Sequence, residues 1–243
     1  MSATVTPPVF AIQRSAERAF FDHGWLQTYH SFSFAEYFDP NNVSWGALRV
    51  LNDDIIAAGA GFPPHPHRDM EIVTYILSGE LLHQDSTGSR GVVGPGGVQF
   101  MSAGTGVKHS EFNHNADRPL HLVQMWVTPG TIGSPPSYGQ RQFEPASRAN
   151  RWLHAVSGQA NVDAPIRITA DATFSVARLD DSSLDYTFAP KRYGFFFVAE
   201  GAVRVNGQDV CAGDAVRMFD IGRIDVRGTG EVLLWDLPEA KEA

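Results

Sequence analysis

The chain has 243 residues and 43% of them are hydrophobic, so it is long enough to bury the core of one large or two small globular domains. Its formal net charge is −8 and it contains no long basic run, which excludes the electrostatic footprint of a nucleic-acid-binding protein. A single cysteine excludes an internal disulfide framework, and no apolar run approaches the roughly 20 residues that cross a bilayer. A cytoplasmic protein is expected, with no nucleic-acid or membrane partner.

The N-terminal segment lacks the charged start and continuous apolar stretch of a signal peptide. The strongest helix signal is short, at residues 15–22, where Ser15 is expected to cap a turn. Strand-like runs with glycine breaks then follow, and the segment Thr128–Pro145 interrupts them with a Gly-, Pro- and Ser-rich stretch that indicates a long loop. Strand-like runs resume at residues 164–180, 193–207 and 231–237. The pattern predicts an all-β protein.

The two halves of the chain resemble each other. Residues 75–85 resemble 197–207, and residues 94–101 resemble 211–218, as hairpins with the same order of apolar and glycine positions. A repeat of this length predicts two copies of one small β-barrel or jelly roll, and chance similarity between hairpins is the alternative. We expect an N-terminal domain at 1–135 and a C-terminal domain at 136–243.

Two pairs of possible metal ligands carry the chemistry. His65 and His67 flank Pro66, and His109 and Glu111 have the same spacing of two residues. Residues two apart on a strand share a face, so each pair can point to one site. Three imidazoles and one carboxylate suit a divalent metal such as Fe, Mn, Ni, Cu or Zn. The sequence predicts a metal site made of these two pairs.

The second half has nothing equivalent. When residues 94–101 are laid on 211–218, Val226 stands opposite His109 and Gly228 opposite Glu111, and no histidine follows His154. One metal site is therefore expected, in the first half. The remaining histidines have no such neighbours and are expected to be structural, solvent-facing or in loops; they are His23, His30, His83, His114, His121 and His154.

These residues resemble known motifs. The two motifs of the cupin superfamily are matched by Gly61, His65, His67, Glu71 and Gly79, and then by Gly106, His109 and Asn113. More narrowly, residues 29–40, 62–88, 101–114 and 122–127 resemble the pirin family. The resemblance implies a bicupin, with the metal in the N-terminal barrel only. Several bacterial members of this family are described as quercetin 2,3-dioxygenases, and other members as nuclear cofactors of transcription.

The two resemblances disagree on one ligand. Most cupins use the glutamate four residues after the second histidine, which is Glu71 here, whereas pirins use the glutamate two after the third histidine, which is Glu111. Both glutamates are an even number of residues from a histidine, so on a regular strand either one can share a face with a histidine. The close match to pirin around residues 109–112 favours Glu111, and Glu71 is then expected to orient a ligand or the guanidinium of Arg68.

The resemblance implies an enzyme that opens the central ring of a flavonol such as quercetin with O2. One divalent transition metal ion is expected, iron first and Mn, Ni, Cu or Zn as alternatives, with Glu111 as both ligand and catalytic base. A monomer is expected. The expected pocket is apolar and lined by residues of the first barrel, namely Phe62, Tyr75, Met101 and Trp126. Gln124 is expected either to line this pocket or to satisfy a backbone group.

Two other functions remain open. A metal-binding regulatory or protein-interaction module would present a saturated metal and a large exposed apolar patch. A different metal-cupin reaction, such as isomerisation of a sugar or keto acid, would need charged groups in the pocket, and the first half offers few besides Arg68 and Lys108.

Overall fold

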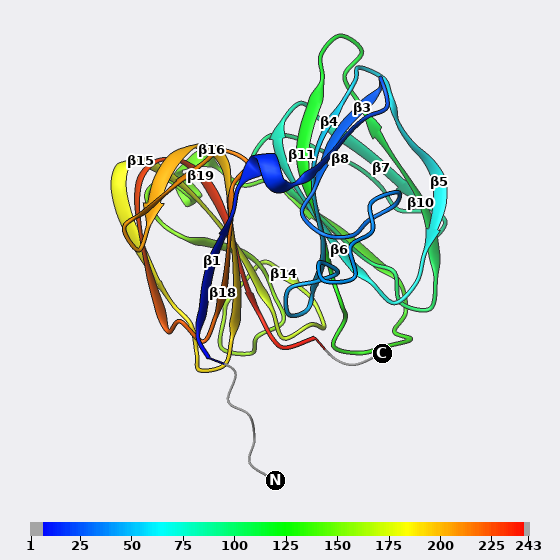
Figure 1. Cartoon of the computed structure of the whole chain (residues 1–243). Coiled ribbons are helices and arrows are strands. Elements are labelled where there is room, and N and C mark those ends of the chain that lie inside the picture. Colours follow the sequence, from blue (N-terminus) through cyan, green and yellow to red (C-terminus); the bar gives the residue numbers. More distant parts are fainter. Residues whose placement is uncertain (1–6, 241–243) are drawn as a thin grey trace.

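The computed structural model describes residues 7–240, and nearly all of their regular structure is strand. The chain forms two β-barrels that lie side by side (Figure 1). Regular helix in the described part is limited to two single 3-10 turns, η1 (Ser15–Glu17) and η2 (Pro145–Ser147). No helix there is long or apolar enough to span a membrane. The all-β prediction is confirmed.

The first barrel consists of a seven-stranded sheet that faces a four-stranded sheet. In spatial order, the strands of the larger sheet are β12 (Ser137–Arg141), β9 (Val98–Ser102), β6 (Glu71–Ser78), β11 (Leu120–Val127), β4 (Leu48–Ile56), β3 (Leu26–His30) and β2 (Ala19–Asp22). Those of the smaller sheet are β5 (Gly61–His67), β10 (Val107–Asn113), β7 (Leu81–Asp85) and β8 (Arg90–Val93).

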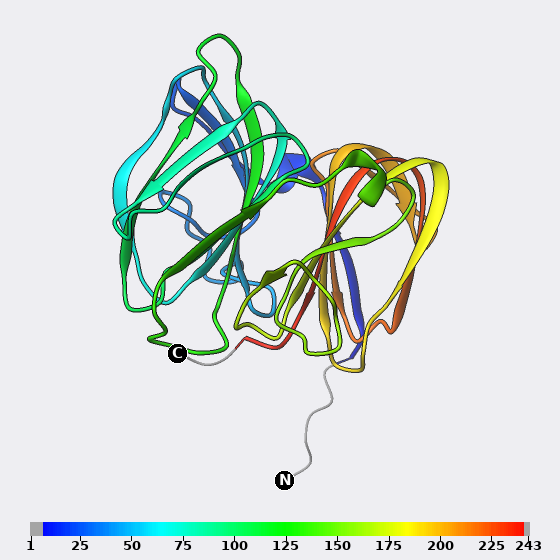
Figure 2. The same cartoon turned by 180° about the vertical axis from the view of Figure 1, so that it is seen from behind.

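The second barrel is built from a single eight-stranded sheet. Its order is β1 (Val9–Gln13), β18 (Ala215–Phe219), β16 (Tyr193–Val205), β19 (Arg223–Leu237), β15 (Thr173–Thr187), β13 (Leu153–Ser157) and β14 (Ile166–Arg167), while β17 (Gln208–Cys211) pairs with β16. Figure 2 shows that the chain reaches this barrel through the segment that holds β12 and η2.

The repeat expected from the sequence is present in the strand pairing. The order β9-β6-β11-β4 in the first barrel matches β18-β16-β19-β15 in the second. The register corrects one detail: Val226 pairs with Val205 as Glu111 pairs with His83, so Val226 occupies the place of Glu111 and not that of His109. The cause is a shorter connection between β18 and β19 than between β9 and β10. Ile224 and Val226 are both fully buried, so the second barrel has an apolar interior here.

The seven-stranded sheet is covered on both faces. One face lines the interior of the first barrel, and the other packs against the second barrel in a core cluster that includes Tyr75, Met125, Phe174 and Trp235. The Trp235 Nε1–H group donates to the Met125 Sδ atom across this interface at 3.0 Å. Burial on both faces explains why the central strands read as nearly continuous apolar runs.

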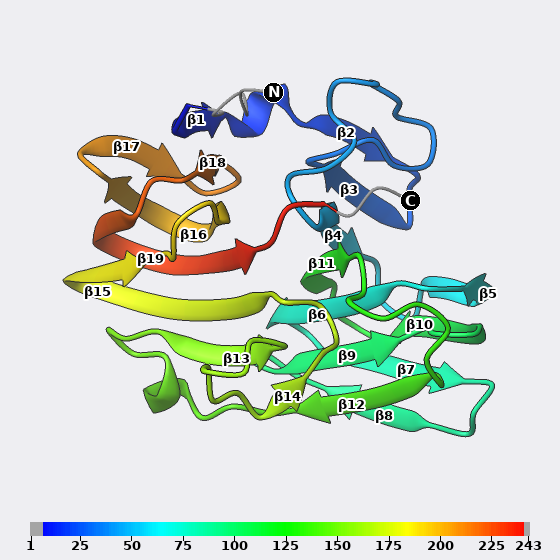
Figure 3. The same ribbon diagram turned by 90° about the horizontal axis from the view of Figure 1, so that it is seen from below.

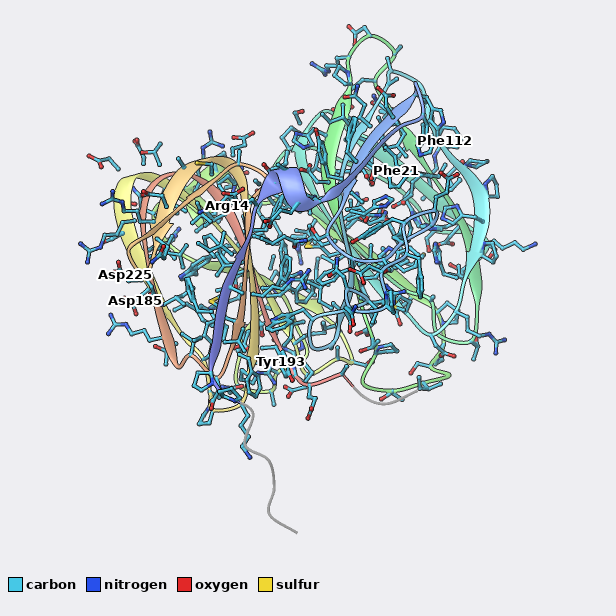
Figure 4. The ribbon with its side chains drawn as sticks, viewed as in Figure 1. Arg14, Phe21, Phe112, Asp185, Tyr193 and Asp225 are labelled. Atoms are coloured by element: carbon cyan, nitrogen blue, oxygen red, sulfur yellow. The ribbon has the colours of Figure 1, made fainter. Side chains whose placement is uncertain are left out.

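Two strands pair across the division expected between residues 135 and 136. β1 joins the sheet of the second barrel through β18, and β12 joins the sheet of the first barrel through β9 (Figure 3). Each covers a sheet edge that would otherwise leave backbone groups unpaired. The connection after β1 is anchored by Arg14, which lies between the barrels in Figure 4 and donates to Asp214 at 2.8 Å. Ser15 is the first residue of η1, so the expected cap at Ser15 is wrong and Arg14 takes that position.

Candidate metal centre

The two pairs of expected ligands lie on neighbouring strands. β5 and β10 are antiparallel, His65 stands directly opposite His109, and a bulge separates His109 from Glu111. Gly61 allows β5 to approach this bulge, because a Cβ atom at that position would lie 2.2 Å from the Glu111 carbonyl oxygen. The pairing therefore brings the expected ligands from two segments of the chain to one place.

Three imidazoles converge there. The ligand nitrogens of His65, His67 and His109 all lie within 4.8 Å of one another. The Nδ1 atom of His65 lies 2.8 Å from the Pro63 carbonyl oxygen, which can only accept, so Nδ1 carries the proton of the neutral ring. The His65 Nε2 lone pair then points at the His109 Nε2 atom at 3.0 Å.

A fourth histidine fixes the tautomer of His109. His83 Nε2 lies 3.1 Å from the Asp85 carboxylate, and His83 Nδ1 lies 3.4 Å from His109 Nδ1. An ionised Asp85 accepts the His83 Nε2 proton, which leaves His83 Nδ1 to accept from His109 Nδ1–H. Burial raises the pKa of Asp85, but hydrogen bonds from Thr87, His83 and the turn backbone outweigh it and lower this pKa to about 2. His109 therefore also presents a bare Nε2 atom to the cluster.

This role of His83 departs from the expectation, which left it without functional neighbours. The same signal that marked the other pairs was present, because His83 and Asp85 are two residues apart and share a face of β7. The contact with His109 depends on the pairing of β7 with β10, which the local sequence does not reveal. The His83 ring is also stacked on Tyr138, with ring centroids 4.1 Å apart.

The environment keeps the rings of His67 and His109 neutral. Burial, followed by the neighbouring histidines, lowers the pKa of His109 to about 3 and the pKa of His67 to about 4. Metal ligation requires the neutral ring. His67 Nε2 is buried and has no hydrogen-bond partner among the described residues. With Nδ1 protonated in the rings of both His65 and His109, their Nε2 atoms face each other at 3.0 Å without a proton between them. Converging lone pairs of this kind repel one another unless a cation lies among them, so the cluster fits a divalent metal ion.

Glu111 lies on β10 beside the cluster, and its side chain reaches toward the larger sheet. Its carboxylate lies within 4.8 Å of His83 and His109 ligand atoms. One oxygen accepts from Gln99 Nε2 at 2.5 Å and the other from Gln124 Nε2 at 2.8 Å. These two amides hold the carboxylate beside the imidazoles. Gln124 thus has a partner in the site, and its oxygen accepts from Trp126 Nε1 at 3.2 Å.

Glu71 binds backbone groups of the second domain and does not face the histidine cluster. Its side chain is fully buried between the barrels, where one oxygen accepts from the Thr169 backbone N–H at 2.7 Å and the other from the Ala170 N–H at 3.0 Å. Burial raises the pKa of Glu71, and these hydrogen bonds oppose that effect. Glu71 connects β6 to the second domain, so the expected contact with a ligand or with Arg68 is replaced by a contact between domains.

Replacing Glu71 by glutamine is expected to lower stability and to leave metal binding intact. The amide would set one N–H group against a backbone N–H and would lose the charge, at a cost of about 2–4 kcal/mol. For a chain of this size the melting temperature should fall by roughly 5–15 °C. Calorimetry and metal analysis of the variant, with exposed Glu144→Gln as the control, check this. A stable variant that has lost its metal would restore Glu71 as the ligand.

Replacing His83 by phenylalanine is expected to weaken metal binding. The new ring keeps the stack on Tyr138 but removes the nitrogen that accepts from His109, and loss of such a partner costs about 10–100-fold in affinity. Competition with a chromophoric chelator for Ni²⁺ measures this, with exposed His114→Phe as the matched control. Unchanged affinity would exclude the orienting role, and complete loss of metal would make His83 a direct ligand.

A cavity of about 350 Å³ opens beside the cluster. Its lining includes His65, His67, Glu111 and Gln124. Of the expected pocket residues, Phe62 and Trp126 line it. The other two expectations are wrong: Tyr75 faces the second barrel and Met101 packs in a separate core cluster. The expectation for Tyr75 failed because both faces of β6 are buried, so apolar character does not distinguish them.

The fold and this cluster define a two-domain cupin with a candidate metal centre in one barrel. The family profile described as Pirin matches residues 11–127, and the profile described as Quercetinase C-terminal cupin domain matches residues 156–237. The chain belongs to the pirin family. The expected family and the bicupin fold are thereby confirmed.

The relatives cover almost the whole chain. A protein of Escherichia coli K12 named quercetin 2,3-dioxygenase is 40% identical over 93% of this chain and 98% of its own. A pirin-like protein of Caulobacter vibrioides is 42% identical over 82% of this chain and 86% of its own. The crystal structure of the bacterial pirin YhhW of Escherichia coli in complex with nickel(II) superposes with a TM-score of 0.88, at 38% identity, over 96% of this chain and 100% of that one.

Proposed function

We propose that the protein is a metal-dependent dioxygenase that opens the central ring of a flavonol such as quercetin. The observation that carries the proposal is the histidine cluster on the wall of an apolar cavity, with the Glu111 carboxylate beside it. The relatives named quercetin 2,3-dioxygenase support the choice of substrate. We propose His65, His67, His109 and Glu111 as the ligands, and a monomeric cytoplasmic protein as the working form.

The side chains around the cavity have different roles in the proposed reaction. When bound, the ion supplies Lewis acidity toward the 3-hydroxyl oxygen of the flavonol. A Glu111 carboxylate oxygen accepts the proton of that hydroxyl group, and Gln99 and Gln124 keep the carboxylate in position by their N–H groups. Phe62 and Trp126 cover the planar rings and exclude water from the reacting carbon atoms.

The ion that the site holds depends on its donor atoms and on which metals are available to the protein. Imidazole and carboxylate donors accept Fe, Mn, Ni, Cu or Zn, and iron remains our first proposal. A related bacterial pirin was crystallised in complex with nickel(II), which supports nickel as one of the alternatives.

The lining of the cavity argues against a keto acid or a phosphorylated sugar as the substrate. The side chains described around it include no lysine or arginine, and Arg68 and Lys108 line a different depression of the surface. A phosphate or carboxylate group would enter the cavity without a cationic partner, which is costly in a mostly apolar site. An uncharged aromatic ligand suits it better.

Metal analysis combined with oxygen uptake on quercetin tests the proposal. The purified protein, reloaded in turn with Fe, Mn, Ni, Cu and Zn, should consume oxygen in proportion to quercetin with at least one ion. No activity with any of the five would reject the dioxygenase and favour a metal-binding regulatory or protein-interaction module.

A further inference from the structure

The cavity has a second wall that is polar although it is buried. Thr28 and His30 on β3 and Asn52 and Asp54 on β4 all line the cavity, and each is at most 4% exposed. The register places Thr28 opposite Asp54 and His30 opposite Asn52, so the four side chains share one face of the larger sheet. His65 and His67 of the histidine cluster line the same cavity from the smaller sheet.

Each of the four side chains of this wall has one buried atom without a hydrogen-bond partner among the described residues. These atoms are Thr28 Oγ1, His30 Nδ1, Asn52 Oδ1 and Asp54 Oδ1. Buried polar atoms are almost always paired, because an unpaired one carries the full cost of its desolvation. Four of them on one face of one cavity, three of which can only accept or are on a ring that can accept, indicate a surface that is completed by the hydroxyl donors of a ligand.

The side chains of this wall offer atoms that can accept hydrogen bonds from hydroxyl groups. Burial, followed by the charges of Arg18 and His23, lowers the pKa of His30 to about 4, so its ring is neutral and can accept at one nitrogen. Asn52 offers a carbonyl oxygen and Asp54 a carboxyl oxygen. Apart from this wall and the residues of the candidate metal centre, the lining is apolar and includes Leu26, Phe34 and Trp126, which can cover a flat ring system.

We propose that His30, Asn52 and Asp54 form a hydroxyl-binding wall, which accepts hydrogen bonds from the phenolic hydroxyl groups of a planar ligand that lies between this wall and the histidine cluster. This inference rests on the proposed function and narrows its substrate class to flavonols that carry ring hydroxyl groups besides the 3-hydroxyl. A site that pairs with a hydroxyl group discriminates strongly against the analogue that lacks it, because its own polar atoms are then left buried and unpaired.

Ligand binding without oxygen tests the wall separately from the chemistry. The probes are quercetin and 3-hydroxyflavone, which keeps the 3-hydroxyl and lacks the other ring hydroxyl groups, titrated into the metal-loaded protein and followed by absorbance and tryptophan fluorescence. We expect wild type to bind quercetin at least roughly tenfold more tightly than 3-hydroxyflavone. Asn52→Leu should weaken quercetin binding by roughly tenfold, equivalent to about 1.4 kcal/mol, and leave 3-hydroxyflavone binding unchanged or tighter.

Two further variants separate recognition from folding. Gln27→Leu also replaces a side-chain amide by leucine, on an exposed residue of β3 that points away from the cavity. It should change the affinity for neither quercetin nor 3-hydroxyflavone. His30→Phe keeps the ring and removes the accepting nitrogen, so it should also reduce the preference for quercetin. Without ligand, Asn52→Leu should melt at the same or a higher temperature, because it removes an unpaired buried oxygen. A lower melting temperature with unchanged preference would make Asn52 a structural residue.

The outcomes distinguish the two proposals. Equal preference for quercetin in wild type, Asn52→Leu and His30→Phe would overturn the wall, as would a wild-type protein that binds neither flavonol. A wild type that binds quercetin selectively but consumes no oxygen would uphold the wall and reject the dioxygenase.

Discussion

Replacing Glu111 by glutamine is expected to slow the turnover of quercetin by at least roughly a hundredfold when the variant carries as much metal as wild type. Glutamine keeps the size and one oxygen donor but loses the negative charge and the basicity. Metal should bind more weakly and still bind, because the three imidazoles remain. Oxygen uptake and metal content, measured on the same sample, give the comparison.

The surroundings of Glu111 allow this variant to fold. The new amide would set an N–H group against Gln99 or Gln124, but the Gln99 Oε1 atom has no partner among the described residues and can turn to accept it. Glu144→Gln, on an exposed residue, is the matched control and should retain full activity. Full activity in loaded Glu111→Gln would remove Glu111 as the base and leave it as a ligand at most.

Replacing His65 by alanine is expected to remove all of the bound metal and, with it, all activity. His65 Nε2 faces His109 Nε2 at 3.0 Å, so its loss opens the centre of the cluster. The second barrel cannot compensate, because Ile224 and Val226 stand at the positions that match His109 and Glu111. Metal content per chain, measured by mass spectrometry, should fall from about one to near zero.

A matched surface change makes the result specific. His114→Ala removes an exposed histidine just beyond β10 and should keep the metal. About one ion per chain remaining in His65→Ala would reveal a second site or a centre held by the other histidines alone.

The sequence by itself determined the fold class and the grouping of the histidines. Alternation on a strand is a local property, so His65 and His67, like His109 and Glu111, could be placed on common faces from spacing alone. The similarity of the two halves predicted the paired barrels, and the absence of histidine after His154 predicted a single candidate centre. The cluster in the structure is made by the residues so predicted, and their binding of metal stays a prediction.

Only the tertiary structure separates the two glutamates, which both have a spacing from a histidine that allows a shared strand face. Glu111 lies beside the histidine cluster, whereas the Glu71 carboxylate accepts from the backbone amides of Thr169 and Ala170 in the other domain. Metal ligation by Glu111 stays a prediction. The role of His83 likewise depends on the pairing of β7 with β10. Contacts between residues far apart in the chain leave no local pattern, so spacing could not reveal them.

The cavity was also decided by tertiary structure. Apolar residues predicted a lining, but the larger sheet is buried on both faces, so Tyr75 could face either the cavity or the second barrel. His30, Asn52 and Asp54 gave no signal as a group, since they come from two strands that meet only through the register of β3 with β4. Alternation identifies which residues share a face, and only the packing of the sheets decides what that face contacts.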